Sequence, residues 1–391
     1  MKHPSIRTLG IVTVSLMMAT RARGAAAPLS PDAMVAAHPL TGAELGSRTS
    51  GGDTPGQTRS SVIQGRRLFT KETFGGNGRS CESCHDLSSG TTSPADAQAL
   101  YAESESHPGN DHSSNLLDPL FRPIDSDDGV GDSYDRLLRH ATIRVVIDLP
   151  AYMTNVDDPS ARSVVLNRGI PSVINSALLL PVLMLDGRES TLQKQALDAV
   201  IAHAEPSRLP AASQQDDISN FESTLFSRPE LADYFHGGPA PELPQGTTPS
   251  EARGRTFFMP GGACNTCHSG PMLNETSSGL RFANIFVSDV NRIGNPVYHF
   301  RVENQDGTVD NIETPDPGLA LTQPEAPAGQ YGIYATANSF RIPTLWNVKA
   351  TAPYFHDNSA DTLEDVLAHY RLYLFLTDQD VVDIIAYLKL L

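Results

Sequence analysis

The chain has 391 residues, with 29 basic residues against 45 acidic ones and a formal net charge of −16. This length accommodates two or three domains with a sizeable core, and a hydrophobic content of 39% argues against general disorder. The acidic balance argues against nucleic acid as a partner, because such binding depends on Lys and Arg neutralising phosphates.

The N-terminus has the pattern of an export signal. Lys2 and Arg7 precede a mainly apolar run over 9–19, and the small residues Gly24–Ala27 offer a cleavage site. We therefore expect a signal peptide over 1–27 and a mature protein in the periplasm. The apolar run is shorter than the roughly 20 residues that cross a bilayer, which argues against stable membrane insertion.

The four cysteines form two motifs of the same pattern. These are Cys81-Glu82-Ser83-Cys84-His85 and Cys264-Asn265-Thr266-Cys267-His268. C-x-x-C-H is the attachment signature of c-type haem. Two thiols three positions apart lie on one side of a helical turn and can add to the two vinyl groups, and the His that follows can bind the iron. Two copies in an exported chain with no further cysteine predict two covalently bound c-type haems.

Other uses of paired cysteines are weaker alternatives. A zinc ribbon places its two halves about 15–20 residues apart, whereas Cys81 and Cys264 are 183 positions apart. Thioredoxin-like redox chemistry leaves both motif histidines unexplained. Disulfides between the motifs are the third alternative, because an exported protein can form them.

The motifs divide the chain into two haem segments. We predict an N-terminal haem domain over 61–236 and a C-terminal haem domain over 251–391, joined by a Pro- and Gly-rich linker over 237–250. Residues 28–60 are rich in Gly, Ser, Thr and Pro and predict a flexible lead-in. The acidic stretch 125–135 lacks the ligand spacing of an EF-hand loop and is expected to be a solvated surface.

Helical signals are clearest near the C-terminus. An apolar stripe with helical spacing is formed by Leu363, Val366, Leu367 and Tyr370. Thr377 with Asp380 resembles a capping box that opens a final helix through Leu391. The strand signal is weak, with only 143–148 suggestive. The predicted fold is mainly α, as two cytochrome c-like haem domains with long loops.

Short motifs in a fixed order surround the two haem signatures. They are Gly65–Phe69, Ile170–Asn175, Asp186–Arg188, Arg341–Leu345 and Thr351–Asp357. In this order the chain resembles the bacterial dihaem cytochrome c peroxidases and their relative MauG, the methylamine-utilisation maturation enzyme. The resemblance implies a haem oxidoreductase that uses hydrogen peroxide, with a peroxidatic first haem and a second haem that stores or passes electrons.

The resemblance also assigns site residues. The family's acid–base glutamate near the first haem matches Glu205, and a glutamine ten residues upstream in the same pocket matches Gln195. The sixth ligand of the second iron is Met in the peroxidases and Tyr in MauG, and this position matches Tyr370. His369 and His356 are alternatives at that iron, and Tyr370 filling the core stripe is another.

Two departures from the family pattern affect the haem pocket and calcium. Inactive-state peroxidases supply a distal His before the first-segment motif, but residues 141–170 contain none. The resemblance therefore implies a first haem that is five-coordinate or water-bound and ready for peroxide. It also allows for calcium, with Thr351 and Pro353 as candidate ligands, although Gly169 stands where members often carry an Asn ligand.

Further departures concern the second haem. The second segment holds only Met259 and Met272, both within nine residues of His268, which disfavours a Met ligand from this segment. Leu185 stands where many members carry a Trp that bridges the haems. Trp346 is the chain's only Trp and is interpreted as a packed aromatic, with a relocated redox relay as the alternative.

Together these patterns predict an exported dihaem oxidoreductase of the MauG type. Oxidising equivalents from hydrogen peroxide would pass between the haems and on to a partner protein. One alternative is a cytochrome c peroxidase that draws electrons from a small redox protein. Another is a non-catalytic dihaem electron-transfer cytochrome.

Overall fold

The structure is a computed structural model that describes residues 55–106, 117–324 and 336–391. The predicted signal peptide, with its cleavage site, lies outside the described residues. Helix accounts for 37% of the structure and strand for 13%. A mainly α fold is therefore confirmed, but strands contribute more than the sequence indicated.

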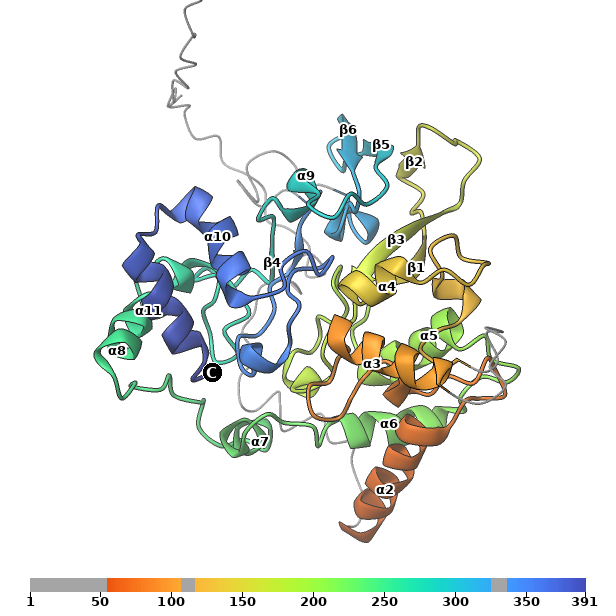
Figure 1. Ribbon diagram of the computed structural model, residues 1–391, viewed down its shortest axis with the longest axis horizontal. Helices are drawn as coiled ribbons and strands as arrows, with labels where there is room; N and C mark the ends of the chain where they lie inside the picture. Colours follow the sequence, from red (N-terminus) through yellow and green to blue (C-terminus); the bar gives the residue numbers. More distant parts are fainter. Residues whose placement is uncertain (1–54, 107–116, 325–335) are drawn as a thin grey trace, which may run out of the picture. The chain divides into compact units, whose positions relative to one another are not determined.

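Helices and short strands alternate along the chain (Figure 1). The helices are α2 (Pro55–Lys71), α3 (Pro94–Glu105), α4 (Asp135–His140), α5 (Leu192–His203), α6 (Ala212–Glu222), α7 (Pro229–Phe235), α8 (Pro249–Thr256), α9 (Val287–Val290), α10 (Leu363–Leu374) and α11 (Asp378–Leu388). The strands are β1 (Thr142–Asp148), β2 (Met153–Asn155), β3 (Ser163–Gly169), β4 (Phe282–Ala283), β5 (Tyr298–Glu303), β6 (Val309–Thr314) and β7 (Phe340–Arg341).

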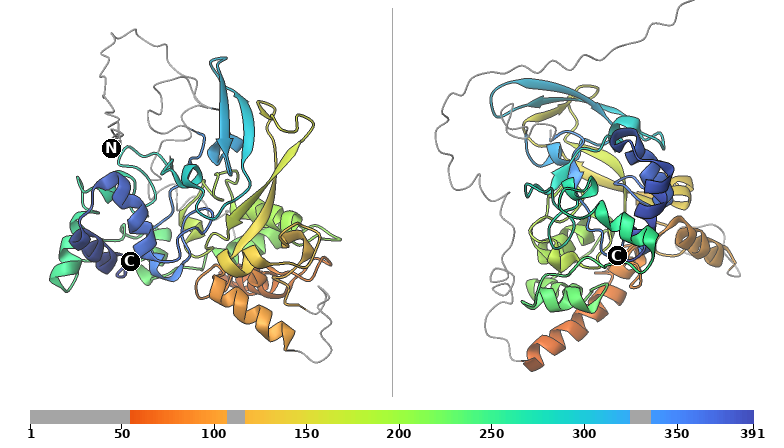
Figure 2. Two further views of the ribbon diagram at one scale, coloured as in Figure 1. Left: turned by 45° about the horizontal axis from the view of Figure 1, so that its top comes forward. Right: turned by 90° about the vertical axis from the view of Figure 1, so that its left-hand side faces the viewer.

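All strand pairs in the described parts of the chain are antiparallel. β1, the predicted strand, pairs with β3 so that Thr142 faces Gly169. β2 pairs with β5, which also pairs with β6, and β4 pairs with β7. β2 belongs to the first predicted haem segment and β5 to the second, so one sheet contains residues of both segments (Figure 2).

Two helix pairs cross at a glycine in the same way. A Cβ on Gly65 of α2 would lie 1.8 Å from the carbonyl oxygen of Asp217 in α6, and one on Gly254 of α8 would lie 2.0 Å from that of Asp383 in α11. Only glycine permits such close backbone approach. Both pairs lie side by side in Figures 1 and 2. Each C-x-x-C-H motif follows the glycine-bearing helix of its pair.

Aromatic contacts repeat beside each crossing. Phe69, four residues after Gly65, packs against Phe221 with ring centroids 5.3 Å apart. Phe258, four residues after Gly254, packs against Tyr387 at 5.4 Å. These rings belong to two separate apolar clusters, one against each haem motif. The two segments therefore share one structural plan, which supports the division into two haem units.

Near the C-terminus, the structure confirms the predicted helices. α10 carries the predicted apolar stripe, and the Thr377 hydroxyl caps α11 by accepting from the Asp380 N–H. α11 ends at Leu388, three residues before the predicted end. Two predicted loops are shorter than expected: α2 begins at Pro55, inside the predicted lead-in, and α8 begins at Pro249, inside the predicted linker.

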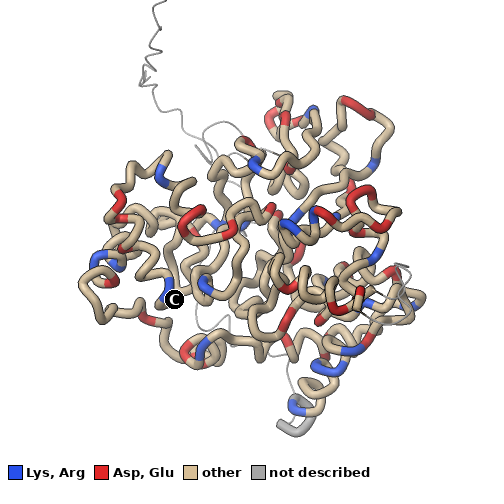
Figure 3. The backbone as a smooth tube through the Cα atoms, viewed as in Figure 1, with Lys and Arg blue, Asp and Glu red and all other residues tan. Residues whose placement is uncertain are grey.

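The acidic stretch 125–135 is only partly a solvated surface. Asp125 is fully buried. Its carboxylate accepts a hydrogen bond from Nη1 of Arg79 at 2.5 Å and another from the backbone N–H of Arg144 at 2.6 Å. The prediction of solvation is wrong for Asp125 because the buried Arg79 requires a counter-charge. Elsewhere, acidic positions are spread over many elements, while basic positions gather on α2 (Figure 3).

A second buried ion network links distant parts of the chain. Arg168, at the end of β3, donates to Asp316 at 2.6 and 2.8 Å and to Asp186 at 2.6 Å. All three side chains are buried. Because Asp316 follows β6, this network holds the first segment against the second.

Candidate functional site

The two C-x-x-C-H motifs adopt the same local conformation. Each begins with a 3-10 turn, Cys81–Ser83 or Cys264–Thr266. The N–H of His85 donates to the Cys81 carbonyl at 3.0 Å, and that of His268 donates to the Cys264 carbonyl at 2.8 Å. All four cysteines are free thiols, which leaves them available for thioether bonds.

Each motif histidine is fixed in one tautomer. Nδ1 of His85 lies 2.8 Å from the carbonyl oxygen of Gly90, and Nδ1 of His268 lies 2.9 Å from that of Leu273. A carbonyl only accepts, so Nδ1 carries the proton and Nε2 keeps its lone pair for a metal. Burial lowers the pKa of both imidazoles, which favours the neutral form that binds iron.

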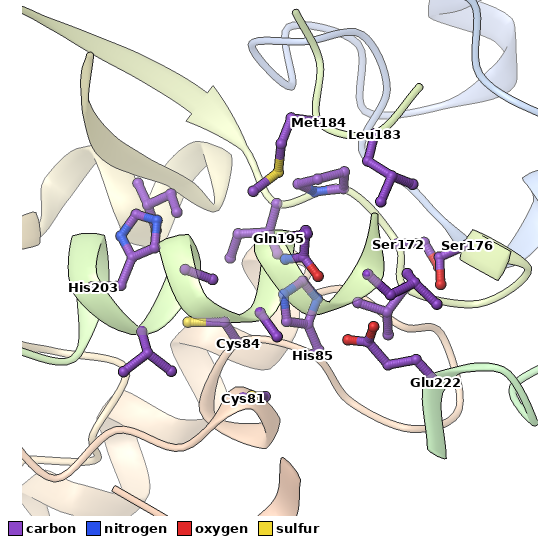
Figure 4. Close-up of a pocket in the computed structure, with 18 of the residues that line it drawn as sticks. Cys81, Cys84, His85, Ser172, Ser176, Leu183, Met184, Gln195, His203 and Glu222 are labelled. Atoms are coloured by element: carbon purple, nitrogen blue, oxygen red, sulfur yellow. The ribbon is translucent and has the colours of Figure 1, made fainter. Parts of the chain in front are cut away.

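A large pocket opens beside the first motif. The space within its lining is about 1270 Å³, which includes open solvent. Cys81, Cys84 and His85 lie in one part of its lining, and α5 passes beside them (Figure 4). The free thiols of Cys81 and Cys84 therefore face the same pocket as His85, which is the arrangement that covalent attachment of a cofactor needs.

α5 contributes a continuous face to this pocket. The helix starts where the Thr191 hydroxyl accepts from the Lys194 N–H. The residues that it gives to the lining are Leu192, Gln195, Ala196, Ala199, Val200 and His203. Most of this face is apolar, and Gln195 and His203 are its polar members. Gln195 thus lies in the pocket, where the sequence resemblance placed it.

Glu205 lies outside the pocket lining. Its backbone adopts φ +47°, directly after the end of α5, and its exposed side chain accepts from Nδ2 of Asn77 at 2.9 Å. Asn77 also donates to the carbonyls of His203 and Ala204, at 3.0 and 2.8 Å. The structure therefore does not bring Glu205 together with Gln195, because this turn directs the chain away from the pocket after Ala204.

A different glutamate lines the pocket. Glu222, the last residue of α6, is 3% exposed, and its Oε2 has no hydrogen-bond partner. Burial raises its pKa to about 8. The sequence analysis missed Glu222, although its position four residues after the apolar Ile218 puts both residues on one face of α6 and could have indicated it.

An unbalanced positive charge faces the pocket from the second segment. Arg341 lines it and is largely buried, and its Nη1 has no hydrogen-bond partner. Burial, followed by the nearby charge of Arg281, lowers its pKa to about 10. Haem carries two propionate carboxylates, which would supply the missing counter-charge. The free thiols, the fixed His85 and Arg341 therefore fit a c-type haem at this pocket.

Tyr370 lies in the apolar cluster of the second motif. It packs in the same cluster as Cys264, and burial, with smaller effects from Cys267 and Cys264, raises its pKa. Within the described residues its hydroxyl has no hydrogen-bond partner. The structure thus places an unpartnered phenol near the second pair of thiols.

The alternative histidine ligands have other partners. Nε2 of His369 lies 2.6 Å from the carbonyl oxygen of Ile285, and its Nδ1 lies 2.5 Å from Nη2 of Arg292. His356 stacks on Phe340 with ring centroids 3.6 Å apart, and its Nε2 lies 3.3 Å from the Ser288 hydroxyl. Neither nitrogen of His369 is free for iron, which leaves Tyr370 as the better-placed group.

Trp346 is packed in the core of the second segment. It is 2% exposed, its indole N–H donates to the Pro271 carbonyl at 2.8 Å, and Arg228 lies over its ring at 4.7 Å. These contacts agree with the interpretation as a packed aromatic. Leu185, at the bridging position, lines the first pocket, and its carbonyl accepts from the Arg341 N–H at 2.8 Å.

The candidate calcium ligands have ordinary structural contacts. The Thr351 hydroxyl donates to the Val348 carbonyl at 3.1 Å, and Pro353 follows a cis peptide bond. Close to Gly169, the amide oxygen of Asn358 would lie 2.1 Å from an added Cβ. In the described part of the chain, no three His, Cys, Asp or Glu side chains gather as a metal site.

Comparison with known proteins bears on the first segment. Residues 60–238 match the family model described as di-haem cytochrome c peroxidase. These residues are less than half of the chain. The match ends before the second motif, so it does not distinguish between the family's branches.

Individual relatives are distant. The cytochrome c551 peroxidase of Nitrosomonas europaea is 27% identical over 177 residues, covering 44% of this chain and 42% of the relative. The cytochrome-c peroxidase IdrP1 of Denitromonas iodatirespirans is 27% identical over 161 residues, covering 36% and 39%. The chain thus aligns with less than half the length of these relatives. A crystal structure of a MauG-like protein associated with microbial copper homeostasis is 20% identical, with 84% and 88% covered and a TM-score of 0.47.

No helix within the described ranges is long and apolar enough to span a bilayer.

Proposed function

We propose that this chain is an exported dihaem c-type oxidoreductase that uses hydrogen peroxide. The observation that carries the proposal is the paired geometry of His85 and His268, each locked by a carbonyl five residues later beside two free thiols. The large pocket at His85 supports assigning the peroxide reaction to the first site. We propose domain limits of 61–236 and 251–391, with the shared β2–β5–β6 sheet joining them.

The first pocket would bind haem through Cys81 and Cys84, with His85 as the proximal ligand. A bound haem supplies an iron centre that can exchange electrons with peroxide. The apolar residues of α5 exclude water from that centre, and the amide of Gln195 can donate a hydrogen bond to a bound peroxide and orient it. Arg341 would neutralise a propionate and hold the haem edge.

The second site would bind haem through Cys264 and Cys267, with His268 as the proximal ligand. Tyr370 is proposed as its sixth ligand, because it packs in the same apolar cluster as Cys264 and its hydroxyl has no hydrogen-bond partner among the described residues. A phenolate stabilises ferric and higher oxidation states more than a thioether does. This ligand favours the MauG-like branch, in which oxidising equivalents reach a partner protein.

A second candidate function is a cytochrome c peroxidase that reduces hydrogen peroxide with electrons from a small redox protein. The names of the two sequence relatives favour it. The two candidates share the first site and differ in the direction of electron flow at the second site. A non-catalytic electron-transfer cytochrome fits less well, because Gln195 and His203 bring polar side chains to the pocket that His85 lines.

Adding hydrogen peroxide to the oxidised holoprotein tests the function. We expect an immediate change in the haem absorption spectrum and consumption of peroxide. An unchanged spectrum would contradict the proposal and favour the electron-transfer cytochrome. Supplying a reduced small cytochrome then separates the branches, since only a peroxidase oxidises it with multiple turnovers.

Tyr370→Phe tests the second ligand. We expect the absorption and electron paramagnetic resonance signals of the second haem to change while those of the first haem stay as in the wild type. Tyr354→Phe serves as a matched control, because the Tyr354 hydroxyl donates to the Val348 carbonyl at 3.1 Å. A Tyr370→Phe protein with wild-type spectra would remove Tyr370 as a ligand.

A further inference from the structure

His203 is a second histidine in the first pocket, and none of the roles assigned above uses it. It is the last residue of α5 and lines the pocket with His85 (Figure 4). Its Nδ1 is buried without a hydrogen-bond partner. His85, by contrast, uses its Nδ1 on the Gly90 carbonyl. A buried imidazole nitrogen without a partner is destabilising unless something else in the pocket binds it.

The spacing along α5 places His203 on the face of Gln195. Gln195, Ala199 and His203 follow one another at intervals of four residues, which puts them on one side of a helix about 12 Å long. Helical side chains lean toward the N-terminus, so His203 leans back toward the turn of Ala199. Ala199, which lies between them on this face, has only a methyl side chain.

Other polar groups of the pocket are less suited to accept a proton. The Gln195 amide is not basic. Arg79, Arg168, Arg188 and Arg341 are cations. The Glu72 carboxylate also lines the pocket, but it already pairs with Nη2 of Arg208 at 2.8 Å and accepts a hydrogen bond from the Phe74 N–H. Glu222 acts electrostatically on Cys81, so it lies at the attachment side of the pocket rather than along α5.

The backbone fixes His203 firmly. Its carbonyl accepts from Nδ2 of Asn77 at 3.0 Å and from Nη1 of Arg79 at 3.3 Å. Arg79 is itself held by the buried Asp125. The same Asn77 also donates to the Glu205 carboxylate, which lies outside the pocket. Asn77 therefore holds His203 at the pocket and Glu205 away from it.

We propose that His203 is the residue that accepts the proton of a protic ligand, such as hydrogen peroxide, when that ligand binds at the first haem. The ligand O–H bond breaks and an imidazole N–H bond forms, so the positive charge moves to the ring and no electron is transferred in this step. The proton can then return to the departing oxygen. This inference deepens the proposed function, since it requires a haem at His85.

Cyanide binding to the ferric holoprotein tests this role without requiring turnover. Hydrogen cyanide loses its proton on binding ferric haem, so the association rate reports the proton acceptor. We expect His203→Leu and His203→Gln to lower this rate at pH 7 by about 100-fold or more. His236→Leu makes the same change at an exposed histidine and is expected to keep the wild-type rate. The Gln variant keeps a polar side chain, so it guards against misfolding of the Leu variant.

Three outcomes would overturn the proposal. The first is an unchanged rate in both His203 variants. The second is a loss confined to Glu205→Gln, which would return the role to the glutamate. The third is a low-spin first haem in the wild type that becomes high-spin only without His203, which would make it an iron ligand. Cyanide binding that depends on His203 in a protein that does not consume peroxide would refute the proposed function alone.

Discussion

A single buried carboxyl group in the first pocket, that of Glu222, couples protonation to folding. Glu222 is almost fully buried, has an oxygen without a partner and has a pKa raised to about 8 by burial. At neutral pH the folded protein therefore favours the protonated acid, whereas the unfolded chain ionises it near its ordinary pKa of 4.5. Folding and proton uptake are coupled at this residue.

This coupling predicts how stability varies with pH. Because the pKa of Glu222 is raised in the folded protein, its protonated carboxyl contributes to the free energy of unfolding. This contribution is fully present below pH 4.5 and is lost as the pH rises through 8. We expect Glu222→Gln to remove a contribution of at most about 4 kcal/mol to the pH dependence. Urea unfolding of wild type and variant at pH 5 and pH 8 measures it. Parallel pH dependences would show that Glu222 does not titrate in this range.

At the site, the sequence predicts the groups whose chemistry requires fixed spacing. The cysteines and histidines of both motifs could be read directly because thioether attachment needs C-x-x-C-H. The position of Glu205 outside the pocket could not be read, because it depends on that residue's own φ of +47° after α5. His203 was missed, although its spacing from Gln195 along α5 could have indicated it. The expectation that no distal histidine is present concerned only 141–170, which contains β1, β2 and β3, whereas His203 lies on the neighbouring helix α5.

At the scale of elements, the two glycine crossings determine how each haem motif is held. Gly65 and Gly254 have helical backbones, so intrinsic propensity alone would favour Ala by about 1 kcal/mol. The added methyl would, however, overlap a carbonyl oxygen at 1.8 or 2.0 Å. The cost of this overlap exceeds the gain in helix propensity, because the atoms in the way are backbone carbonyl oxygens of Asp217 and Asp383 and not the ends of flexible side chains.

We therefore expect Gly65→Ala and Gly254→Ala to destabilise the protein by about 1–3 kcal/mol or more. Gly237→Ala is the control, because nothing lies within 4 Å of its added Cβ and only its φ of +90° causes strain. Thermal and urea unfolding of the three variants separate overlap from strain. A stabilised Gly65→Ala protein would mean that α2 and α6 do not touch at this point.

Elements with strong local signals were predicted well. β1, α10 and α11 follow from apolar periodicity and a capping box. The β5–β6 hairpin was missed although β5 alternates apolar and polar residues as a half-buried strand does. β6 lacks this alternation, and most of its residues are exposed. β2 was missed because its three residues become a strand only by pairing with β5.

At the scale of the whole molecule, the Arg168 network replaces a simple linker between the segments. Arg168 is buried with both Asp186 and Asp316, and those carboxylates come from opposite segments. Breaking a buried ion pair leaves an uncompensated charge in a low-dielectric environment. The sequence could not predict this network, because its three members lie 18 and 148 positions apart.

Removing this cation should destabilise the whole protein. We expect Arg168→Met to cost about 3–5 kcal/mol of unfolding free energy. Arg301→Met is the matched control, because Arg301 pairs with Glu303 at 2.6 Å with both side chains exposed, and should cost at most about 1 kcal/mol. Chemical denaturation of both variants decides the matter, and equal losses would contradict a special role for the buried network.

The repeated crossing of α2 with α6 and of α8 with α11 has an evolutionary consequence. The crossed helix pair that precedes each C-x-x-C-H motif occurs twice in the same form. A duplicated copy of this unit would therefore still hold two thiols and a histidine in the same arrangement. His203 and Tyr370, the residues that we propose to make the two centres unequal, lie on α5 and α10, outside both crossings. One centre can therefore acquire a new reactivity through changes on a single helix while its twin keeps its inherited role.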